Sequence, residues 1–166
     1  MLLKSKTLSI TIIALISLIS CDKARVYDQY ASIDKGWNSD EAFVFEYENK
    51  DTITPYNYFI NMRANKDFPF HNLFLIVETH TPNKTITVDT LEYLMAKPDG
   101  TLLGNGFSDI KESKLWFKED QNLPEIGMYK YRIYQAVRET GKVKGVKELN
   151  GITEVGFRIE KTNNDE

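Results

Sequence analysis

Cys21 is the residue whose chemistry can be assigned most directly from its neighbours, and it is the only cysteine of the chain. It follows Leu18-Ile19-Ser20, which places a branched apolar residue three positions before it and a small residue directly before it. Lipoprotein signal peptidase accepts this pattern. The thiol then carries a thioether-linked diacylglycerol, and the freed amino group carries an amide-linked acyl chain. We therefore predict lipidation at Cys21 and expect no cofactor besides these covalent lipids.

The segment before this cysteine has the composition of an export signal. Lys4 and Lys6 give it a positive beginning, and an uncharged apolar stretch follows from Thr7 to Ser20. A helix that spans a membrane needs about 20 apolar residues, and this stretch is shorter and ends in charged residues. Residues 1–20 are therefore expected to be a signal peptide, with a retained anchor as the weaker alternative. Residues 21–166 are expected to form a single lipid-anchored domain.

The other side chains that could do chemistry form no catalytic pattern. No serine after Cys21 lies in a Gly-x-Ser-x-Gly elbow, and His71 and His80 belong to no His-Glu-x-x-His motif. Asp99, Asn105 and Asp109 resemble a loose calcium loop, because Ca²⁺ prefers oxygen ligands. Their spacing among glycines is more typical of turns. We predict no catalytic residue and no metal site.

Aromatic side chains are the candidates for binding. Trp37 and Phe68 lie in polar stretches, and Phe70 follows closely. If they are exposed together with Tyr30, they mark a protein interface, where Trp and Tyr concentrate as anchors. The same rings and Trp116 could instead form a face that stacks against sugars.

The elements that must position these residues are predicted to be strands. Aromatic residues make up 12% of the chain, and they alternate with polar residues between clusters of Gly, Pro, Asn and Asp. Met128–Arg138 alternates most clearly, whereas Leu73–Val77 is apolar on both faces, as in a central strand. Asp109–Glu119 is the best helix candidate and also fits a strand. Other strand candidates are Phe43–Glu48, Tyr56–Met62, Thr85–Met95, Leu102–Leu103 after the Asp99-Gly100 turn, Lys114–Phe117 and Ile152–Ile159.

These runs predict an all-β fold of seven to nine strands with little helix. A β-sandwich of jelly-roll or Greek-key order is favoured over a closed barrel. Without the signal peptide the chain has 19 basic and 24 acidic residues, a net charge of −5, which disfavours nucleic acid and anionic lipid surfaces as partners. Since Cys21 would be acylated, no disulfide can form, and the domain must depend on its core.

An ordered series of motifs resembles the GldH family of gliding-motility lipoproteins of the Bacteroidetes. It covers nearly the whole chain after the signal peptide, with two departures, at Ala64 and Thr101. The motifs are Cys21-Asp22 with Tyr27 and Tyr30, Trp37, Tyr56-Asn57, Arg63-Ala64-Asn65, Asp67 to Leu73, Asp89 to Tyr93, Asp99 to Gly106, Gly127-Met128-Tyr129, Gln135 to Arg138, Gly151-Ile152 and Val155-Gly156.

The resemblance implies a non-enzymatic envelope lipoprotein that is required for gliding and linked to the type IX secretion apparatus. Its expected partners are the membrane, through the lipid anchor, and other gliding and secretion proteins, and no small-molecule substrate is expected. A periplasm-facing domain is favoured, because the residues after Cys21 form no acidic run. Thr52 in Asp51-Thr52-Ile53 resembles the O-glycosylation sites of this bacterial group. A carbohydrate-binding module or glycan-processing lipoprotein is the alternative.

Overall fold

The computed structural model describes residues 23–106, 109–139 and 141–162, so Cys21 and the predicted signal peptide lie outside it. The described residues form strands and no helix, and hence no helix that could cross a membrane. The strands are β1 (Arg25–Ser32), β2 (Trp37–Asn38), β3 (Phe43–Asn49), β4 (Tyr56–Ala64), β5 (Asn72–His80), β6 (Ile86–Leu94), β7 (Lys111–Gln121), β8 (Gly127–Gln135), β9 (Glu148–Leu149) and β10 (Ile152–Lys161).

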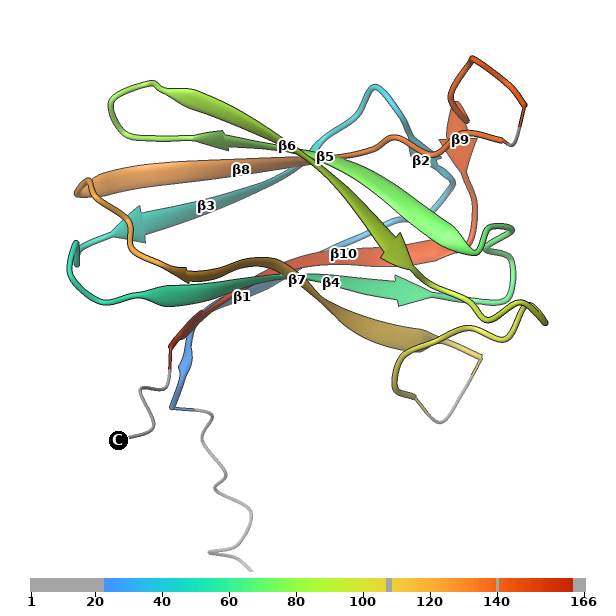
Figure 1. The fold of residues 1–166 in the computed structure, drawn as a ribbon, viewed down its shortest axis with the longest axis horizontal. Coiled ribbons are helices and arrows are strands. Elements are labelled where there is room, and N and C mark those ends of the chain that lie inside the picture. Colours follow the sequence, from blue (N-terminus) through green and yellow to red (C-terminus); the bar gives the residue numbers. More distant parts are fainter. Residues whose placement is uncertain (1–22, 107–108, 140, 163–166) are drawn as a thin grey trace, which may run out of the picture.

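Two antiparallel four-stranded sheets pack face to face (Figure 1). The β1 sheet has the order β1-β10-β4-β7, and the β3 sheet has the order β3-β8-β5-β6. With the short β2-β9 ribbon set aside, the eight long strands follow the orders 1-8-3-6 and 2-7-4-5. This is a jelly roll, since successive long strands cross between the sheets, except for the β5-β6 hairpin, and the first and last strands pair. The all-β sandwich expectation is confirmed.

The two ends of the sandwich differ in their connections (Figure 1). One end, which we call the leash end, has the short turns 50–55, 81–85 and 122–126, together with the start of β1 and the end of β10. At the opposite end the longer segments 33–42, 65–71, 95–110 and 136–151 join the strands. The chain therefore enters and leaves the domain at the end with the short turns.

The core between the sheets is built from aromatic rings. Phe157 of β10 lies at its centre, and its ring centroid is 4.3 Å from that of Tyr131 and 5.9 Å from that of Phe45. Rings of this size bury large apolar areas and favour such offset or edge contacts. Tyr58, which is also buried, packs against both Tyr131 and Phe157. The domain thus encloses a core without a disulfide among its described residues.

Some sequence expectations are corrected. The described residues form ten strands instead of seven to nine, because Trp37–Asn38 and Glu148–Leu149 pair over two residues each. Leu102–Leu103 does not begin a strand after the Asp99-Gly100 turn. It makes only an isolated bridge between Ala96 and Leu102, since the chain turns again at Gly104, where φ is +102°. Most of Asp109–Glu119 forms a strand, within β7.

Candidate interaction face

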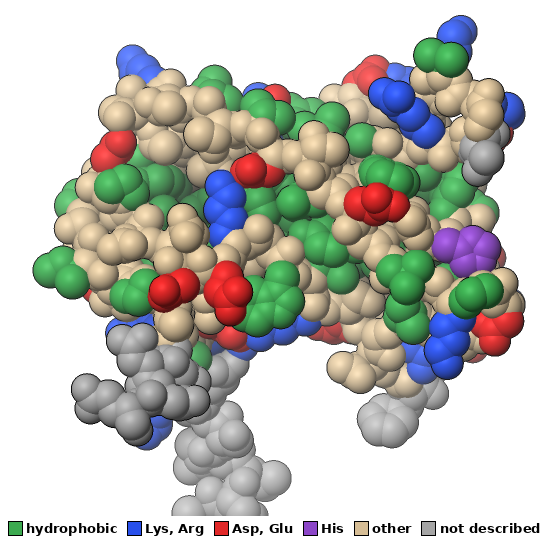
Figure 2. Space-filling model, viewed as in Figure 1, with side chains coloured by type: hydrophobic (Ala, Val, Ile, Leu, Met, Phe, Trp, Pro, Cys, Tyr) green, Lys and Arg blue, Asp and Glu red, His purple; other side chains and the backbone are tan. Residues whose placement is uncertain are grey.

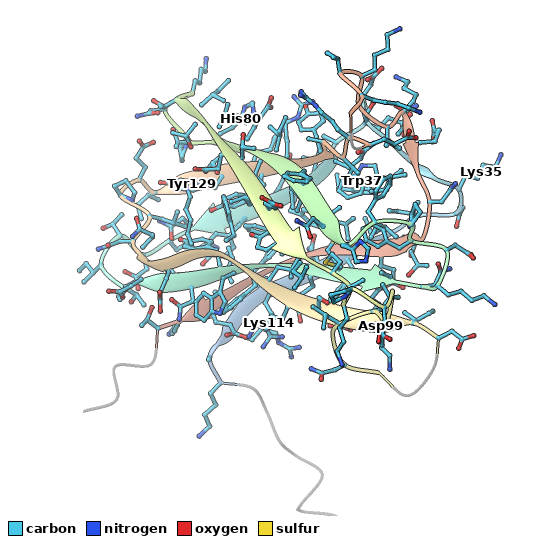
Figure 3. The ribbon with its side chains drawn as sticks, turned by 45° about the vertical axis from the view of Figure 1, so that its right-hand side comes forward. Lys35, Trp37, His80, Asp99, Lys114 and Tyr129 are labelled. Atoms are coloured by element: carbon cyan, nitrogen blue, oxygen red, sulfur yellow. The ribbon has the colours of Figure 1, made fainter. Side chains whose placement is uncertain are left out.

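The outer face of the β1 sheet holds a dense group of polar and aromatic side chains, and we call it the ladder face. Four outward positions lie in one row across the sheet, Tyr30 on β1, Gly156 on β10, Asn61 on β4 and Lys114 on β7. Figure 3 shows Lys114 on the outside of this sheet. Strands so far apart in the sequence supply this row because the jelly roll brings the first and last strands together.

Gly156 allows Tyr30 to lie across the sheet. A Cβ atom at position 156 would be 2.8 Å from two ring carbons of Tyr30, closer than side chains pack. The Tyr30 hydroxyl accepts a hydrogen bond from Asn61 Nδ2 at 2.8 Å and donates one to Glu112 Oε1 at 3.0 Å. Partial burial, and secondarily the bond to Glu112, raises the pKa of Tyr30 to about 12. The ring is therefore a neutral, fixed element of the face.

Arg63 joins three strands next to this ring. Its Nε donates to Glu112 Oε2 on β7 at 2.8 Å, and one terminal nitrogen donates to Glu154 Oε2 on β10 at 2.6 Å. The guanidinium carbon lies 4.9 Å from the centroid of the Tyr30 ring, a cation–π distance. The bond to Glu112 raises the already high pKa of Arg63. Its orientation is set by both carboxylates and the ring.

A second charged group lies beside the first. Arg158 of β10 donates to Asp28 Oδ2 at 2.9 Å and to Glu160 Oε1 at 2.5 Å, and Lys114 Nζ contacts the same Glu160 oxygen at 2.7 Å. All but Lys114 are largely buried side chains. Acidic and basic groups on the ladder face therefore neutralise one another, and the face carries no strong field of one sign.

Trp116 is the most exposed aromatic side chain of the ladder face. It is 52% exposed and packs at 4.4 Å between centroids on Phe59, which is itself 3% exposed. Lys114 Nζ lies 3.9 Å from the Phe59 centroid. Trp, Tyr and Arg are the residues that most often dominate binding energy at protein interfaces. The ladder face combines all three on rigid strands.

The residues predicted as interface anchors lie elsewhere. Trp37 is 2% exposed, donates from Nε1 to the Glu41 carbonyl at 3.0 Å, and packs on Phe43 between the sheets (Figure 3). Phe68 is 7% exposed because its loop folds back over the core. Phe70 is half-buried and packs edge-to-face on Phe68. Trp37 and Phe68 are thus core residues, and the condition that they be exposed beside Tyr30 is not met.

Other sequence candidates remain apart. His71 and His80 lie at opposite ends of β5, and His80 pairs with Glu78. Asp99 accepts from the Thr101 amide, which lowers the pKa of its carboxyl, as expected for a turn residue. Thr52 lies in the short 50–55 turn, and its glycosylation stays a prediction. Among the described residues, no group of three acidic or histidine side chains could hold a metal ion.

Sequence reasoning named Tyr30 and Trp116 but missed the contacts of Asn61, Arg63 and Glu112 around Tyr30 and the packing of Trp116 on Phe59. One signal was available, since an isolated glycine within an alternating strand, here Gly156, often marks the close approach of a neighbour. The partners that exploit this approach depend on strand register.

On the face viewed in Figure 2, hydrophobic side chains show between the two sheets, and charged side chains of both signs are scattered among them. The face viewed in Figure 2 therefore shows no large area of one charge that would attract an oppositely charged partner.

Comparison with known proteins identifies relatives along nearly the whole chain. The chain is 53% identical to the gliding motility lipoprotein GldH of Flavobacterium johnsoniae over 95% of its own length and 98% of that protein. It is 52% identical to a GldH homolog of Christiangramia forsetii, over 93% of this chain and 95% of that protein.

Among solved structures, the VP2 subviral particle of infectious bursal disease virus aligns with 87% of this chain and 34% of the viral chain, so this chain spans about a third of it. That alignment has a TM-score of 0.39 and 15% identity. The model of the family described as GldH lipoprotein matches residues 25–159. With this match and relatives above half identity over their full length, the chain belongs to the GldH lipoprotein family.

Proposed function

We propose that this protein is a non-enzymatic, lipid-anchored docking component of the gliding and type IX secretion apparatus. Family membership supports the process, because the relatives are gliding motility lipoproteins. The observation that supports docking is the exposure of Trp116 on the same prearranged sheet face as Tyr30 and Arg63. A partner that covers Trp116 would bury an aromatic ring that the described chain leaves 52% exposed.

As a lipoprotein, the protein is held at a membrane by lipid. We place the attachment at Cys21. Each buried CH₂ contributes about 0.8 kcal/mol, so one acyl chain binds marginally while two or more hold firmly. A Cys21→Ala strain is expected to release the domain from the membrane and to stop gliding. A strain with this change that glides normally would contradict the anchor.

The docking role is tested with Trp116→Ala in cells, with Val143→Ala as the control. Val143 is 89% exposed in the loop between β8 and β9, so it provides an exposed apolar position away from the ladder face. Crosslinking followed by co-purification should recover gliding and secretion proteins with the unaltered chain and the control, and fewer with Trp116→Ala. Equal recovery and normal gliding with Trp116→Ala would exclude the ladder face as the docking surface.

The domain is proposed to face the periplasm. Protease added to intact cells should then leave the domain uncut, and it should be cut only after the outer membrane is opened. Cleavage in intact cells would instead place it on the cell surface.

A carbohydrate-binding or glycan-processing role is the second candidate, and one observation favours it. Trp116 and the underlying Phe59 offer an exposed aromatic surface next to the polar groups of the ladder face. Purified domain applied to an array of bacterial glycans would show binding that is lost in Trp116→Ala. The absence of binding by the unaltered domain would leave docking as the explanation.

A further inference from the structure

The exposed side chains of the leash end suggest what this end contacts. Ile53 is 82% exposed in the 50–55 turn, and Ile126 is 61% exposed in the 122–126 turn. Turns of this kind are usually occupied by small polar residues, whose side chains bond to the backbone. Hydrophobic side chains also project at this end in the space-filling view (Figure 2, left).

The two isoleucines are presented by a rigid end. The Asn122 side-chain Nδ2 donates to the Ile53 carbonyl at 3.4 Å. The buried Asn49 donates from Nδ2 to the Leu123 and Glu125 carbonyls. Asp51 Oδ1 accepts from the Ile53 amide at 2.8 Å. The turns that carry Ile53 and Ile126 are therefore fixed to one another.

The length of chain between Cys21 and the first strand determines which end lies near the membrane. The Ala24 carbonyl already accepts a hydrogen bond from the Lys161 amide at 2.8 Å, and Lys161 pairs with Tyr56 of β4. Two residues lie between Cys21 and Ala24, so the three steps of chain from one to the other reach at most about 10 Å. The opposite end lies a full length of β10 away, about 30 Å. Lipid attached at Cys21 therefore holds the leash end against the membrane.

We propose that Ile53 and Ile126 insert into the lipid surface that holds the acyl chains. This inference rests on the proposed anchor at Cys21. The turns of the leash end carry charges of both signs, Lys50 and Lys84 beside Asp51 and Glu125, so they have no net charge to attract a charged lipid. The proposed contact therefore depends on the apolar isoleucine side chains. Lipids without net charge should therefore serve as well as anionic lipids, and added salt should not weaken the contact.

The test uses the lipidated protein, purified with its processed N-terminus, in vesicles of phosphatidylethanolamine and phosphatidylcholine. Since acylation blocks Cys21, a cysteine introduced by Ile53→Cys or Ile126→Cys is the one free thiol for an environment-sensitive fluorophore. Val143→Cys provides the matched control, an exposed aliphatic position at the other end. Near-ultraviolet circular dichroism confirms that each labelled variant is folded.

Fluorophores at 53 and 126 are expected to shift to the blue and to be quenched several-fold by lipids carrying nitroxides on their acyl chains, at low and high salt. The fluorophore at 143 should show neither effect. Protein that floats with the vesicles while positions 53 and 126 behave like 143 would overturn the lipid-facing assignment alone. Protein that does not float, or that carries a reactive Cys21 thiol, would overturn the anchor and this inference with it.

Discussion

Replacing Tyr30 by phenylalanine should destabilise the domain more than removing the hydroxyl of a tyrosine that is 37% exposed usually does. The Asn61 side chain is 2% exposed, its Oδ1 has no hydrogen-bond partner, and its Nδ2 bonds to the Tyr30 hydroxyl. Without that hydroxyl, a buried amide would have no side-chain partner. Leaving a buried polar group unsatisfied costs about 1–3 kcal/mol, so we expect a loss of about 2 kcal/mol in the free energy of unfolding.

Urea unfolding of the Cys21→Ser form, which is free of lipid, measures this loss. With an m-value of about 2 kcal/mol/M, the midpoint should fall by about 1 M. Tyr27→Phe is the matched control on the same strand, because the Tyr27 hydroxyl donates to the exposed Gln29. Its free energy of unfolding should change by less than about 0.5 kcal/mol.

A second substitution separates the buried amide from other causes. Adding Asn61→Leu to Tyr30→Phe replaces both partners by apolar groups, which can be nearly neutral, so much of the lost stability should return. A double variant no more stable than Tyr30→Phe, or a Tyr30→Phe midpoint equal to that of Tyr27→Phe, would refute the reasoning.

Three further results are expected. Gly151→Ala should lower the melting temperature by about 5 °C or more, because φ is +83° and the new Cβ would lie 2.0 Å from the Phe68 nitrogen. Gly100→Ala is the control, since Gly100 has a similar φ but open space around it, and it should lower the melting temperature less. Equal losses would show that the clash at position 151 is relieved. Burial raises the pKa of Tyr30 and Tyr93 to about 12, above the unfolded value of 10.0, so the stability that they contribute is complete below pH 10 and is lost as the pH rises toward 12. Urea midpoints should therefore fall across this interval, and constant midpoints would contradict the shifts. The intact mass of the mature protein should show an unmodified Thr52 if the 50–55 turn lies at the lipid surface, and a glycan there would count against that placement.

The strands could be predicted because their signal is local. In β8, Tyr129, Tyr131 and Ile133 are buried while the residues between them are not, as the alternation of Met128–Arg138 indicates. Leu73–Val77 reads as a central strand for a related reason. It lies in β5, between β8 and β6, and its outward residues Phe74 and Ile76 are only partly exposed.

Burial of the loop aromatics could not be predicted from their neighbours. Trp37 and Phe68 stand among polar residues, and their burial depends on segments distant in the sequence. Trp37 is held by the pairing of β2 with β9, where it lies opposite Leu149. The backbone of Phe68 lies so near Gly151 that a Cβ atom at position 151 would be 2.0 Å from the Phe68 nitrogen. A polar local context therefore gave the wrong exposure for both rings.

The ladder face could be predicted only in part for the same reason. Tyr30 and Glu112 are 82 residues apart and meet because β1 pairs with β10, β10 with β4, and β4 with β7. A shift of one residue in any of these pairings would move the outward side chains of one strand to its other face and so separate Tyr30, Asn61 and Glu112. The residues of the face can be read from the sequence, but their arrangement depends on the strand registers of the three pairings β1–β10, β10–β4 and β4–β7.

The strand that follows the proposed lipid anchor also carries part of the proposed docking surface, and this restricts where a partner can be. Eight residues lie between Cys21 and Tyr30, so their Cα atoms are at most about 30 Å apart even if the chain is fully extended. β1 begins at Arg25 and is bonded to β10, so little of this length is free to swing. A partner that covers Tyr30 must therefore reach within about 30 Å of the proposed lipid attachment. We expect such a partner to be anchored in the same membrane or to lie directly against it.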